Sequence, residues 1–461
     1  MWLSEFLQEM SLSSAALLLL MIWTALLVAL VIVIGRQGQG GALTLGSFLN
    51  LSLVHVPGVL PYLVSTPEHA ADPDATRLGF GMTVLGLAVF VAGAVLARRI
   101  DRPHAAAKGA PRRQRPRVSG SLGWRAIALG VVAFFVVLPL ATIMPSLTSI
   151  VLPLATLLIL GMWLRLYDAA AAADWRRALG TLALLPLLPV ATLVAGGFLY
   201  YGTAWVLSIV TFHFVISRRR IWFYIAAPPL VFLGLSLFVT YMDQRAEFRA
   251  VREHESLFER LDRASYIVTD FELLDLTSPA QVEIIDNRLN QNLFVGLGVM
   301  RHEAGWYDFL YGGTVPLWSL IPRAVWPDKP DVGGGGNILR DFIGIPVAVG
   351  TSQGPGEVLE FYMNFGVPGV LIGFLGLGYL LMWLDHGVMR ALTAGNTRGF
   401  LLRAMPGLAL LPANGGNLLE ALVGGVAAVV VAHLIVWLRF ADIGAALPRR
   451  RLPGEHVVSS Q

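Results

Sequence analysis

Long apolar runs recur along most of the 461 residues of this chain. About 20 residues, at a rise of about 1.5 Å each, cover the hydrocarbon core of a bilayer, so such runs between charged or turn-rich breaks are typical of membrane-spanning helices. The composition agrees, because 56% of the residues are hydrophobic and only 14% are charged. The predicted spans are residues 14–34, 42–64, 78–96, 124–143, 147–166, 179–199, 203–217, 221–241, 366–384, 400–411 and 418–438. The sequence therefore predicts an all-α integral membrane protein with about eleven (10–12) transmembrane helices.

Two of these runs leave alternatives open. Residues 400–411 are few and contain Arg403 and Pro406, so this segment is either a span or a broken, re-entrant helix. Residues 179–217 fit one long tilted helix or two spans, and the sequence Tyr200-Tyr201-Gly202 favours an interfacial turn between two.

The positions of lysine and arginine predict the orientation of the chain. Residues 98–117 hold eight basic residues against a single Asp101, which places this loop in the cytoplasm. The basic clusters within 165–177, 218–220, 390–398 and 449–451 then fall on the same side, and the acidic hairpin 68–74 falls on the other. The N-terminus is therefore expected outside and the C-terminus inside. We interpret the 98–117 loop as a topology and lipid-headgroup signal, and not as a nucleic-acid-binding segment.

The charge distribution sets one external segment apart from the rest. Between Asp243 and Asp341 lie 16 of the 30 acidic residues and only 10 lysines or arginines. We expect four regions: an N-terminal membrane bundle (1–241), one large external loop domain (242–356) between the eighth and ninth helices, C-terminal membrane helices (357–441), and a cytoplasmic tail (442–461). In the loop, residues 243–266 and 281–307 have amphipathic helical patterns, whereas the proline and glycine content of 311–356 indicates irregular backbone.

Two carboxylates stand where the external loop meets the ninth helix. Glu357, Glu360 and Asn364 have the spacing i, i+3 and i+7, which puts all three on one helix face. Carboxylates at the mouth of a spanning helix are functional candidates, although acids in a first turn also stabilise the helix dipole or pair with arginine. No metal site or cofactor is expected: the chain has no cysteine, and Asp328 and Asp331 alone are too weak a signal for a divalent ion.

The loop motif resembles the Wzy-type polymerases that join oligosaccharide repeat units in O-antigen and exopolysaccharide assembly. That family has Pro-Arg, two residues, and Trp-Pro-x-Lys-Pro, followed by a Gly/Asn-containing stretch, a glutamate and Asn-Phe-Gly at the next helix. The corresponding residues here are Pro322, Arg323, Trp326, Pro327, Lys329, Pro330, Asn337, Glu357 or Glu360, Asn364, Phe365, Gly366 and Gly369. The similarity covers about residues 287–374. It overlaps with the O-antigen ligases, but their His-Asn ahead of this helix has no histidine counterpart here.

The resemblance implies a polytopic architecture like that of the GT-C glycosyltransferases in a bacterial inner membrane, with a periplasmic N-terminus and a cytoplasmic C-terminus. It also implies an enzyme that transfers a growing glycan from undecaprenyl diphosphate to the next lipid-linked repeat unit. The implied partners are these glycans, membrane lipids, and a chain-length regulator and flippase of the same pathway. A different class, a lipid-linked oligosaccharide flippase or permease, would concentrate ionisable or helix-breaking residues near the bilayer midplane. A structural partner of an assembly machine is a third possibility.

The external residues suit this chemistry on physical grounds. A leaving lipid diphosphate needs cations, and arginine binds it bidentately without a metal. We expect Arg288 and Arg323 to clamp the diphosphate, with Lys329, Arg301 and Arg340 as further cations. Asn337, Asn364 and Trp326 are expected to contact substrate. The acceptor hydroxyl needs a base, and Glu357, Glu360 and His302 are the candidates; a lone histidine and interfacial aromatic residues also have ordinary structural explanations.

Overall fold

The structure is a computed structural model. It describes residues 10–35, 40–64, 72–101, 120–141, 151–196, 199–217, 220–251, 259, 262, 266–267, 269–309, 321, 325–326, 328, 335–346, 353–411, 416 and 418–438. Every regular element within these residues is a helix. Eight helices are long and apolar enough to cross a membrane, and two shorter apolar helices accompany them. The all-helical polytopic architecture is thus confirmed, while the total of eleven spans stays a prediction.

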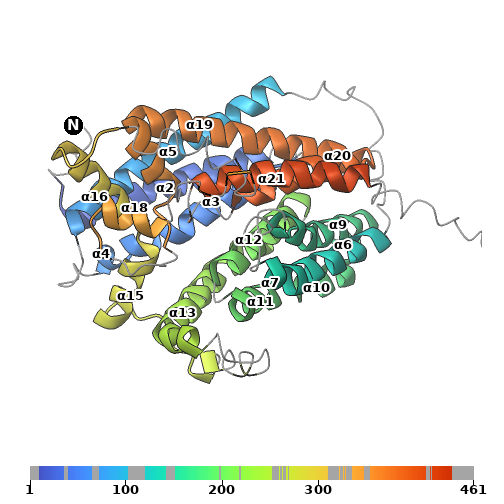
Figure 1. Cartoon of the computed structure of the whole chain (residues 1–461), viewed down its shortest axis with the longest axis horizontal. Coiled ribbons are helices and arrows are strands. Elements are labelled where there is room, and N and C mark those ends of the chain that lie inside the picture. Colours follow the sequence, from blue (N-terminus) through green and yellow to red (C-terminus); the bar gives the residue numbers. More distant parts are fainter. Residues whose placement is uncertain are drawn as a thin grey trace, which may run out of the picture.

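Two long helices run side by side along the upper side of the molecule in the view of Figure 1. Helix α5 (Pro73–Ile100) and helix α19 (Glu357–Thr393) pack along each other although they are far apart in sequence. Glycines permit this approach, because a Cβ on Gly93 would clash with the carbonyl of Leu375, and one on Gly378 with the carbonyl of Phe90. Helix α19 bends at Gly366, whose φ of 64° breaks the helical backbone. The predicted ninth span, 366–384, is therefore only the middle of a longer, kinked element.

Helix α2 (Leu12–Gly35) lies along α5, and helix α3 (Ala42–His55) is enclosed by its neighbours (Figure 1). The predicted span 42–64 is broken into α3, a 3-10 turn η1 (Pro57–Val59) and α4 (Pro61–Val64). The prolines at the start of η1 and α4 explain the breaks, because proline has no amide hydrogen to continue a helix. Asp72 caps the start of α5, accepting a hydrogen bond from the amide of Ala75 at 2.9 Å.

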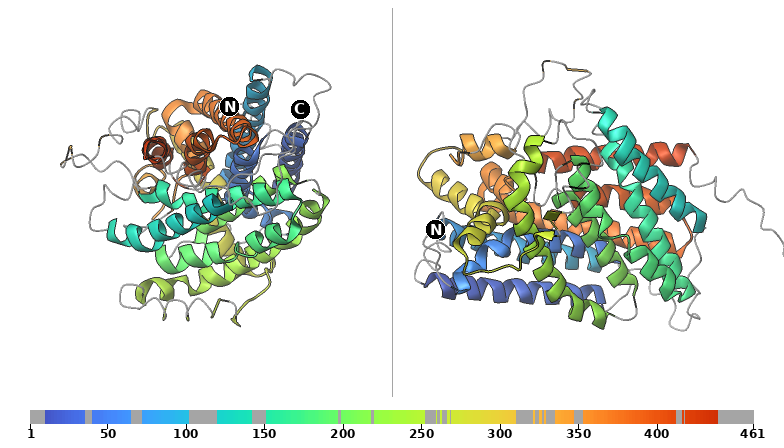
Figure 2. Two further views of the ribbon diagram at one scale, coloured as in Figure 1. Left: turned by 90° about the vertical axis from the view of Figure 1, so that its right-hand side faces the viewer. Right: turned by 90° about the horizontal axis from the view of Figure 1, so that it is seen from below.

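A second group of helices lies beside this core (Figure 2). It comprises α6 (Gly120–Val132), a π-helical turn η2 (Ala133–Val137), α7 (Leu138–Ala141), α9 (Leu157–Ala172), α10 (Trp175–Leu182), α11 (Leu187–Gly196), α12 (Leu199–Ile216) and α13 (Ile221–Val251). Helices α11 and α12 pack against each other, with Gly202 against Leu188 and Pro189. Residues 179–217 are therefore separate helices that fold back, and not one long helix. Helix α13 runs without a break through the expected boundary at residue 241.

The external segment is more deeply packed than its sequence pattern predicts. The stretch 281–307 forms α15 (Pro279–Leu289) and α16 (Gln291–Glu303), and most of α16 is buried. Its backbone meets α5 closely: a Cβ on Gly79 would clash with the carbonyl of Asn292, and one on Gly296 with that of Ala75. An amphipathic helix would expose one face, but most of α16 is buried because α5 and α19 both pack against it.

Two further differences concern the end of the external segment and the last helices. Residues Gly335–Asp341 form a short helix, α18, inside the stretch expected to be irregular, because Ile338 and Leu339 after the glycine run bury themselves in the core. The described part of the predicted helix 243–266 begins as the end of α13. Helix α20 (Thr397–Leu410) remains continuous through Pro406, and α21 (Leu418–Trp437) completes the chain's described helices.

Candidate functional site

The turn Gln353–Gly356, directly before α19, is contacted by Arg288 and leads into Glu357. The amide of Gly356 donates to the carbonyl of Gly416 at 3.0 Å, which ties the turn to the approach to α21. The Nε2 of Gln291 donates to the carbonyl of Gly354 at 3.3 Å, which ties it to the start of α16. Gly356 has φ of 81°, a conformation that L side chains rarely adopt, so glycine is needed here. The turn thus joins the start of α16 and the approach to α21 to the first residue of α19.

Arg288 reaches this turn from the last turn of α15. Its Nη1 donates to Oε1 of Gln353 at 3.3 Å, while Nε2 of Gln353 donates to the carbonyl of Asn287 at 2.7 Å. The half-buried guanidinium of Arg288 therefore contacts Gln353, which is four residues before Glu357 in the sequence. That Arg288 clamps a diphosphate stays a prediction.

Glu357 is the first residue of α19 and is almost completely buried, with 2% of its surface exposed. Its Oε2 has no hydrogen-bond partner among the described residues. An unsatisfied buried carboxylate oxygen is costly, so such a group normally has a reason outside the packing of its own helix. Its position at the helix N-terminus favours the charged form, but that field does not replace a hydrogen bond.

Glu360 has a different environment one turn further along α19. It is also buried, and its Oε1 accepts a hydrogen bond from the amide of Leu418 at 2.8 Å. Leu418 is the first residue of α21, so Glu360 caps that helix. Asn364 donates from Nδ2 to the backbone carbonyl of Glu360 at 2.8 Å. The predicted common face therefore exists, but Glu360 and Asn364 have structural contacts there.

Arg301 and His302 lie at the other end of α16. The guanidinium of Arg301 lies over the ring of Trp306, with 4.8 Å from Cζ to the ring centroid. His302 stacks on Phe309 with 3.8 Å between ring centroids. Burial raises the pKa of the Tyr307 phenol above its usual value, and the proximity of Tyr362 adds to this. Tyr307 is therefore protonated at neutral pH and donates to the carbonyl of Gly298 at 2.6 Å.

Helix α18 separates the two groups of cations. At its start, a Cβ on Gly335 would meet the backbone of Gln353 and Gly354. At its end, Arg340 donates to Oδ1 of Asn337 at 2.8 Å and to Oδ1 of Asp341 at 3.0 Å. Seven residues of helix measure about 10 Å. The predicted binding residues thus fall into two places: Arg288 near the Gln353–Gly356 turn, and Arg340 with Asn337 toward the other end of α18.

Two predicted residues, Arg323 and Lys329, lie outside the described residues. Trp326 between them is described and is 36% exposed. The sequence reasoning missed Gln291 and Gln353, which connect the candidate residues to one another. The run Asn290-Gln291-Asn292 between two apolar-patterned stretches was the signal that could have found the first. Nothing in the sequence around Gln353 distinguishes it from other loop residues.

A buried polar network behind the turn fixes α15 and α16 to the membrane helices. Asn292 makes two contacts with His55 at the end of α3: its Oδ1 lies 2.7 Å from Nδ1, and its Nδ2 donates to the backbone carbonyl at 2.7 Å. Asn290 donates from Nδ2 to Oδ1 of Asp286 at 2.5 Å and to Oγ1 of Thr76 at 3.0 Å. These hydrogen bonds position α15 and α16 against α3 and α5, although the buried Nε2 of His55 has no partner among the described residues.

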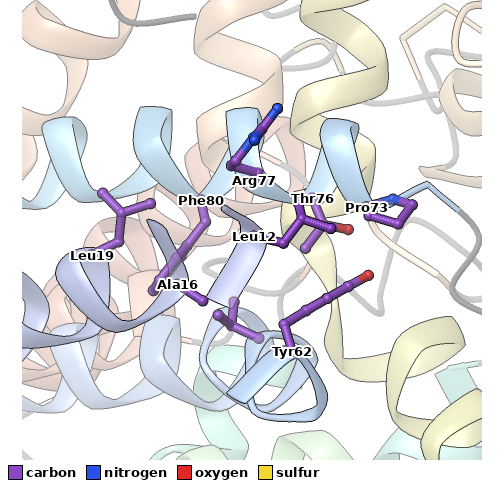
Figure 3. A pocket seen from close by; sticks show the side chains of 9 residues that line it. Leu12, Ala16, Leu19, Tyr62, Pro73, Thr76, Arg77 and Phe80 are labelled. Atoms are coloured by element: carbon purple, nitrogen blue, oxygen red, sulfur yellow. The ribbon is translucent and has the colours of Figure 1, made fainter. Parts of the chain in front are cut away.

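A small pocket lies near this network, between α2, α4 and α5 (Figure 3). Tyr62, Thr76 and Arg77 provide its polar lining, and apolar residues complete it. Its volume of about 10 Å³ has room for roughly one water molecule. This pocket is therefore too small for a sugar or a diphosphate, and it is not the candidate site.

The described residues contain no group of three histidine, aspartate or glutamate side chains that could hold a metal ion. The groups that the described residues bring to the Gln353–Gly356 turn are a carboxylate, a guanidinium and amides. Comparison with protein-family models, curated proteins and solved structures finds no match to this chain.

Proposed function

We propose that this chain is a membrane-embedded glycosyltransferase that polymerises undecaprenyl-diphosphate-linked oligosaccharide repeat units at the periplasmic face of the inner membrane. The observation that carries the proposal is that Arg288 bonds to Gln353 in the turn directly before α19, whose first residue is the buried Glu357. A guanidinium suits a diphosphate leaving group, and a carboxylate suits the activation of an acceptor hydroxyl. The loop motif at residues 322–330 supports the same activity through its resemblance to the Wzy-type polymerases.

The reaction assigns a separate role to each group. The acceptor hydroxyl oxygen bonds to the anomeric carbon of the donor glycan, and the bond from that carbon to the diphosphate oxygen breaks. The hydroxyl proton passes to a base, and the negative charge remains on the lipid diphosphate. Among the predicted bases, Glu357 fits best, because its Oε2 has no partner in the described structure while Glu360 caps α21. Arg288, together with Arg323 of the loop motif, is proposed to bind the diphosphate.

A genetic experiment tests this proposal. The Arg288→Ala, Arg323→Ala and Glu357→Gln proteins would be produced at the abundance of the unmodified protein, and the chain lengths of the surface polysaccharide would be measured. We expect long chains to disappear and single repeat units to accumulate on the carrier outside the membrane. Glu283→Gln, an exposed carboxylate on α15, and Arg176→Ala, an exposed arginine on α10, are matched controls that should leave the chain lengths unchanged. Long chains in all three test variants would contradict the assignment.

A transporter is the second candidate, and one observation favours it. Helix α3 is a short, enclosed helix with polar groups along it, and the buried Oδ1 of Asn50 has no hydrogen-bond partner among the described residues. Polar groups on interrupted helices are typical of transporter binding sites. The same experiment separates the two functions, because a defective flippase leaves repeat units on the cytoplasmic side. An Asn50→Leu variant with normal chain lengths would count against transport.

The proposed orientation has its own test. The natural chain contains no cysteine, so a single cysteine can be introduced without background labelling. An impermeant thiol reagent added to intact cells is expected to label Glu283→Cys and to leave Arg176→Cys unlabelled until the cells are broken. The opposite pattern would place the external segment, and the proposed active site, on the wrong side for this reaction.

A further inference from the structure

A groove runs between α19, α20 and α21 and shares no lining residue with the Gln353–Gly356 turn. Helix α20 packs against both α19 and α21 and forms its floor. The groove has a volume of about 470 Å³ and is lined by Leu380, Trp383, Leu384, Leu402, Arg403, Pro406, Leu410, Leu422, Gly425, Val426 and Val429. Several of the lining residues have large apolar side chains that are exposed on the protein surface, and contact with lipid would accommodate this exposure. Arg403 is the single charged residue of the lining.

The charge of Arg403 has no counter-ion within the described structure. Its Nη1 donates to the carbonyl of Gly399 at 3.2 Å, and its stem packs against Gly387 on α19. None of the ion pairs among the described residues includes it. Asp385, two residues from Gly387, accepts its hydrogen bonds from α3. Placing a charged guanidinium between apolar helices costs free energy. An anion beside the guanidinium lowers this cost, and so does extension of the side chain to the membrane–water interface.

The location of Arg403 restricts which anion can reach it. It lies six residues after Thr397, the start of α20, so it is about 9 Å along the helix from the turn that joins α19 and α20. The groove continues from Arg403 to Leu410 for about 10 Å more, compared with about 15 Å for the hydrocarbon of one leaflet. The groove thus has a cation toward the headgroup end and an apolar channel toward the bilayer centre.

We propose that this groove binds an anionic phospholipid of the leaflet that faces the α19–α20 turn. The lipid phosphate pairs with Arg403, and one acyl chain lies along the channel between α19 and α21. Charge complementarity argues for this occupant, because an apolar segment of protein would leave the guanidinium unpaired. The site is independent of the proposed polymerase activity, since none of its lining residues belongs to the Gln353–Gly356 turn.

Lipid binding to the purified full-length chain tests the proposal. Native mass spectrometry in detergent would measure binding of dioleoyl phosphatidylglycerol, which is anionic, and dioleoyl phosphatidylcholine, which has no net charge. We expect the unmodified chain to bind phosphatidylglycerol about fivefold more tightly, which corresponds to one cation near a lipid phosphate. Arg403→Met should abolish this preference and Arg403→Lys should retain much of it. Arg99→Met, an exposed arginine at the end of α5, is the control that should keep it.

A second variant tests the channel separately from the charge. A side chain at Gly425 would project toward Leu410 across the groove, so Gly425→Leu should weaken binding of both lipids. Gly376→Leu, at a position on α19 with open space around it, is the matched control. Equal thermal unfolding of all variants excludes misfolding as the cause. An unchanged preference in Arg403→Met, or unchanged binding in Gly425→Leu, would overturn the proposal. If a polyprenyl phosphate displaced phosphatidylglycerol, the groove would be a site for the carrier lipid instead. If the unmodified chain were a dimer and Gly425→Leu a monomer, the groove would be an interface between two copies of the chain.

Discussion

Two buried carboxylates on the same helix, α19, have opposite hydrogen-bonding states. Asp385, near the end of the helix, is 1% exposed, and Glu357, at its start, is 2% exposed. Asp385 accepts from the amides of Leu43 and Thr44 at 3.0 and 2.9 Å, and from the Thr44 hydroxyl at 2.7 Å. The Oε2 of Glu357 has no such partner among the described residues. Burial alone therefore does not identify a functional acid, whereas an unmet hydrogen-bonding need points to one.

Asp385 has a structural role in holding α3 against α19. It caps the start of α3, where free amides and the helix dipole favour a negative charge. The preceding Gly40 and Gly41 both have positive φ and let the chain approach, since a Cβ on Gly40 would meet the carbonyl of Asp385 at 2.8 Å. An aspartate within a membrane helix, which sequence reasoning would assign to function, here fixes an interrupted helix in place.

Loss of the Asp385 carboxylate should have the largest effect. Asp385→Ala leaves two buried amides and a hydroxyl without an acceptor, so we expect the free energy of unfolding to fall by roughly 3–5 kcal/mol. Asp385→Asn keeps one acceptor oxygen and should lose less. Denaturation in detergent micelles measures both. If Asp385→Ala were as stable as the unmodified chain, the contrast between the two acids would fail.

Glu357 should respond differently. Glu357→Gln replaces a buried carboxyl group that has an unmet hydrogen-bonding need by an amide of nearly the same shape, so we expect the free energy of unfolding to stay about equal. The rate of glycan polymerisation should fall by about 100-fold or more, as for the loss of a catalytic base. Both quantities would be measured on the same preparation. A strong loss of stability together with activity would assign Glu357 a structural role like that of Asp385.

Glu360 is expected to lie between these two cases. Glu360→Ala removes the acceptor for the Leu418 amide, and the loss of a helix cap is worth about 1 kcal/mol. Glu360→Gln keeps an acceptor oxygen and should be close to neutral. Amide hydrogen exchange at the start of α21 would report the fraying directly. Unchanged protection there in Glu360→Ala would remove the capping role.

The smallest effect is expected for an ion pair at the far end of α5. Asp101 accepts from Nη1 and Nη2 of Arg390 at 3.0 and 2.8 Å, but 53% of the arginine side chain is exposed. Solvent screens such a pair, so Arg390→Met should lower the free energy of unfolding by less than about 1 kcal/mol. The difference should shrink further in high salt. A loss as large as that of Asp385→Ala would show that exposure does not weaken this contact.

The positions of the spanning helices were largely predictable, because apolar length is a local property of the sequence. Residues 14–34 correspond closely to α2, and 418–438 to α21. Helix ends were less predictable: α19 begins nine residues before the expected 366, since a glycine kink joins two helical pieces. Residues 42–64 matched the length of a span, but Pro57 and Pro61 break the helix locally.

The candidate site was predictable only in part. Helical spacing placed Glu357 and Glu360 together, and both are buried in the first turns of α19. Their different partners were not predictable, because the amide that Glu360 caps lies 58 residues later in the chain. The role of Gln353, which links Arg288 to the turn, depends on the same kind of distant contact.

The sequence by itself determined that the chain is helical and apolar enough to cross a membrane, because both properties follow from residue composition over about 20 positions. Only the tertiary structure decided which polar groups are satisfied. It paired Asp385 with α3, joined Asn292 to His55, and left an oxygen of Glu357 without a partner among the described residues. Hydrogen bonds between distant segments depend on how the helices pack, and close glycine contacts, such as that of Gly93 of α5 with Leu375 of α19, set that packing.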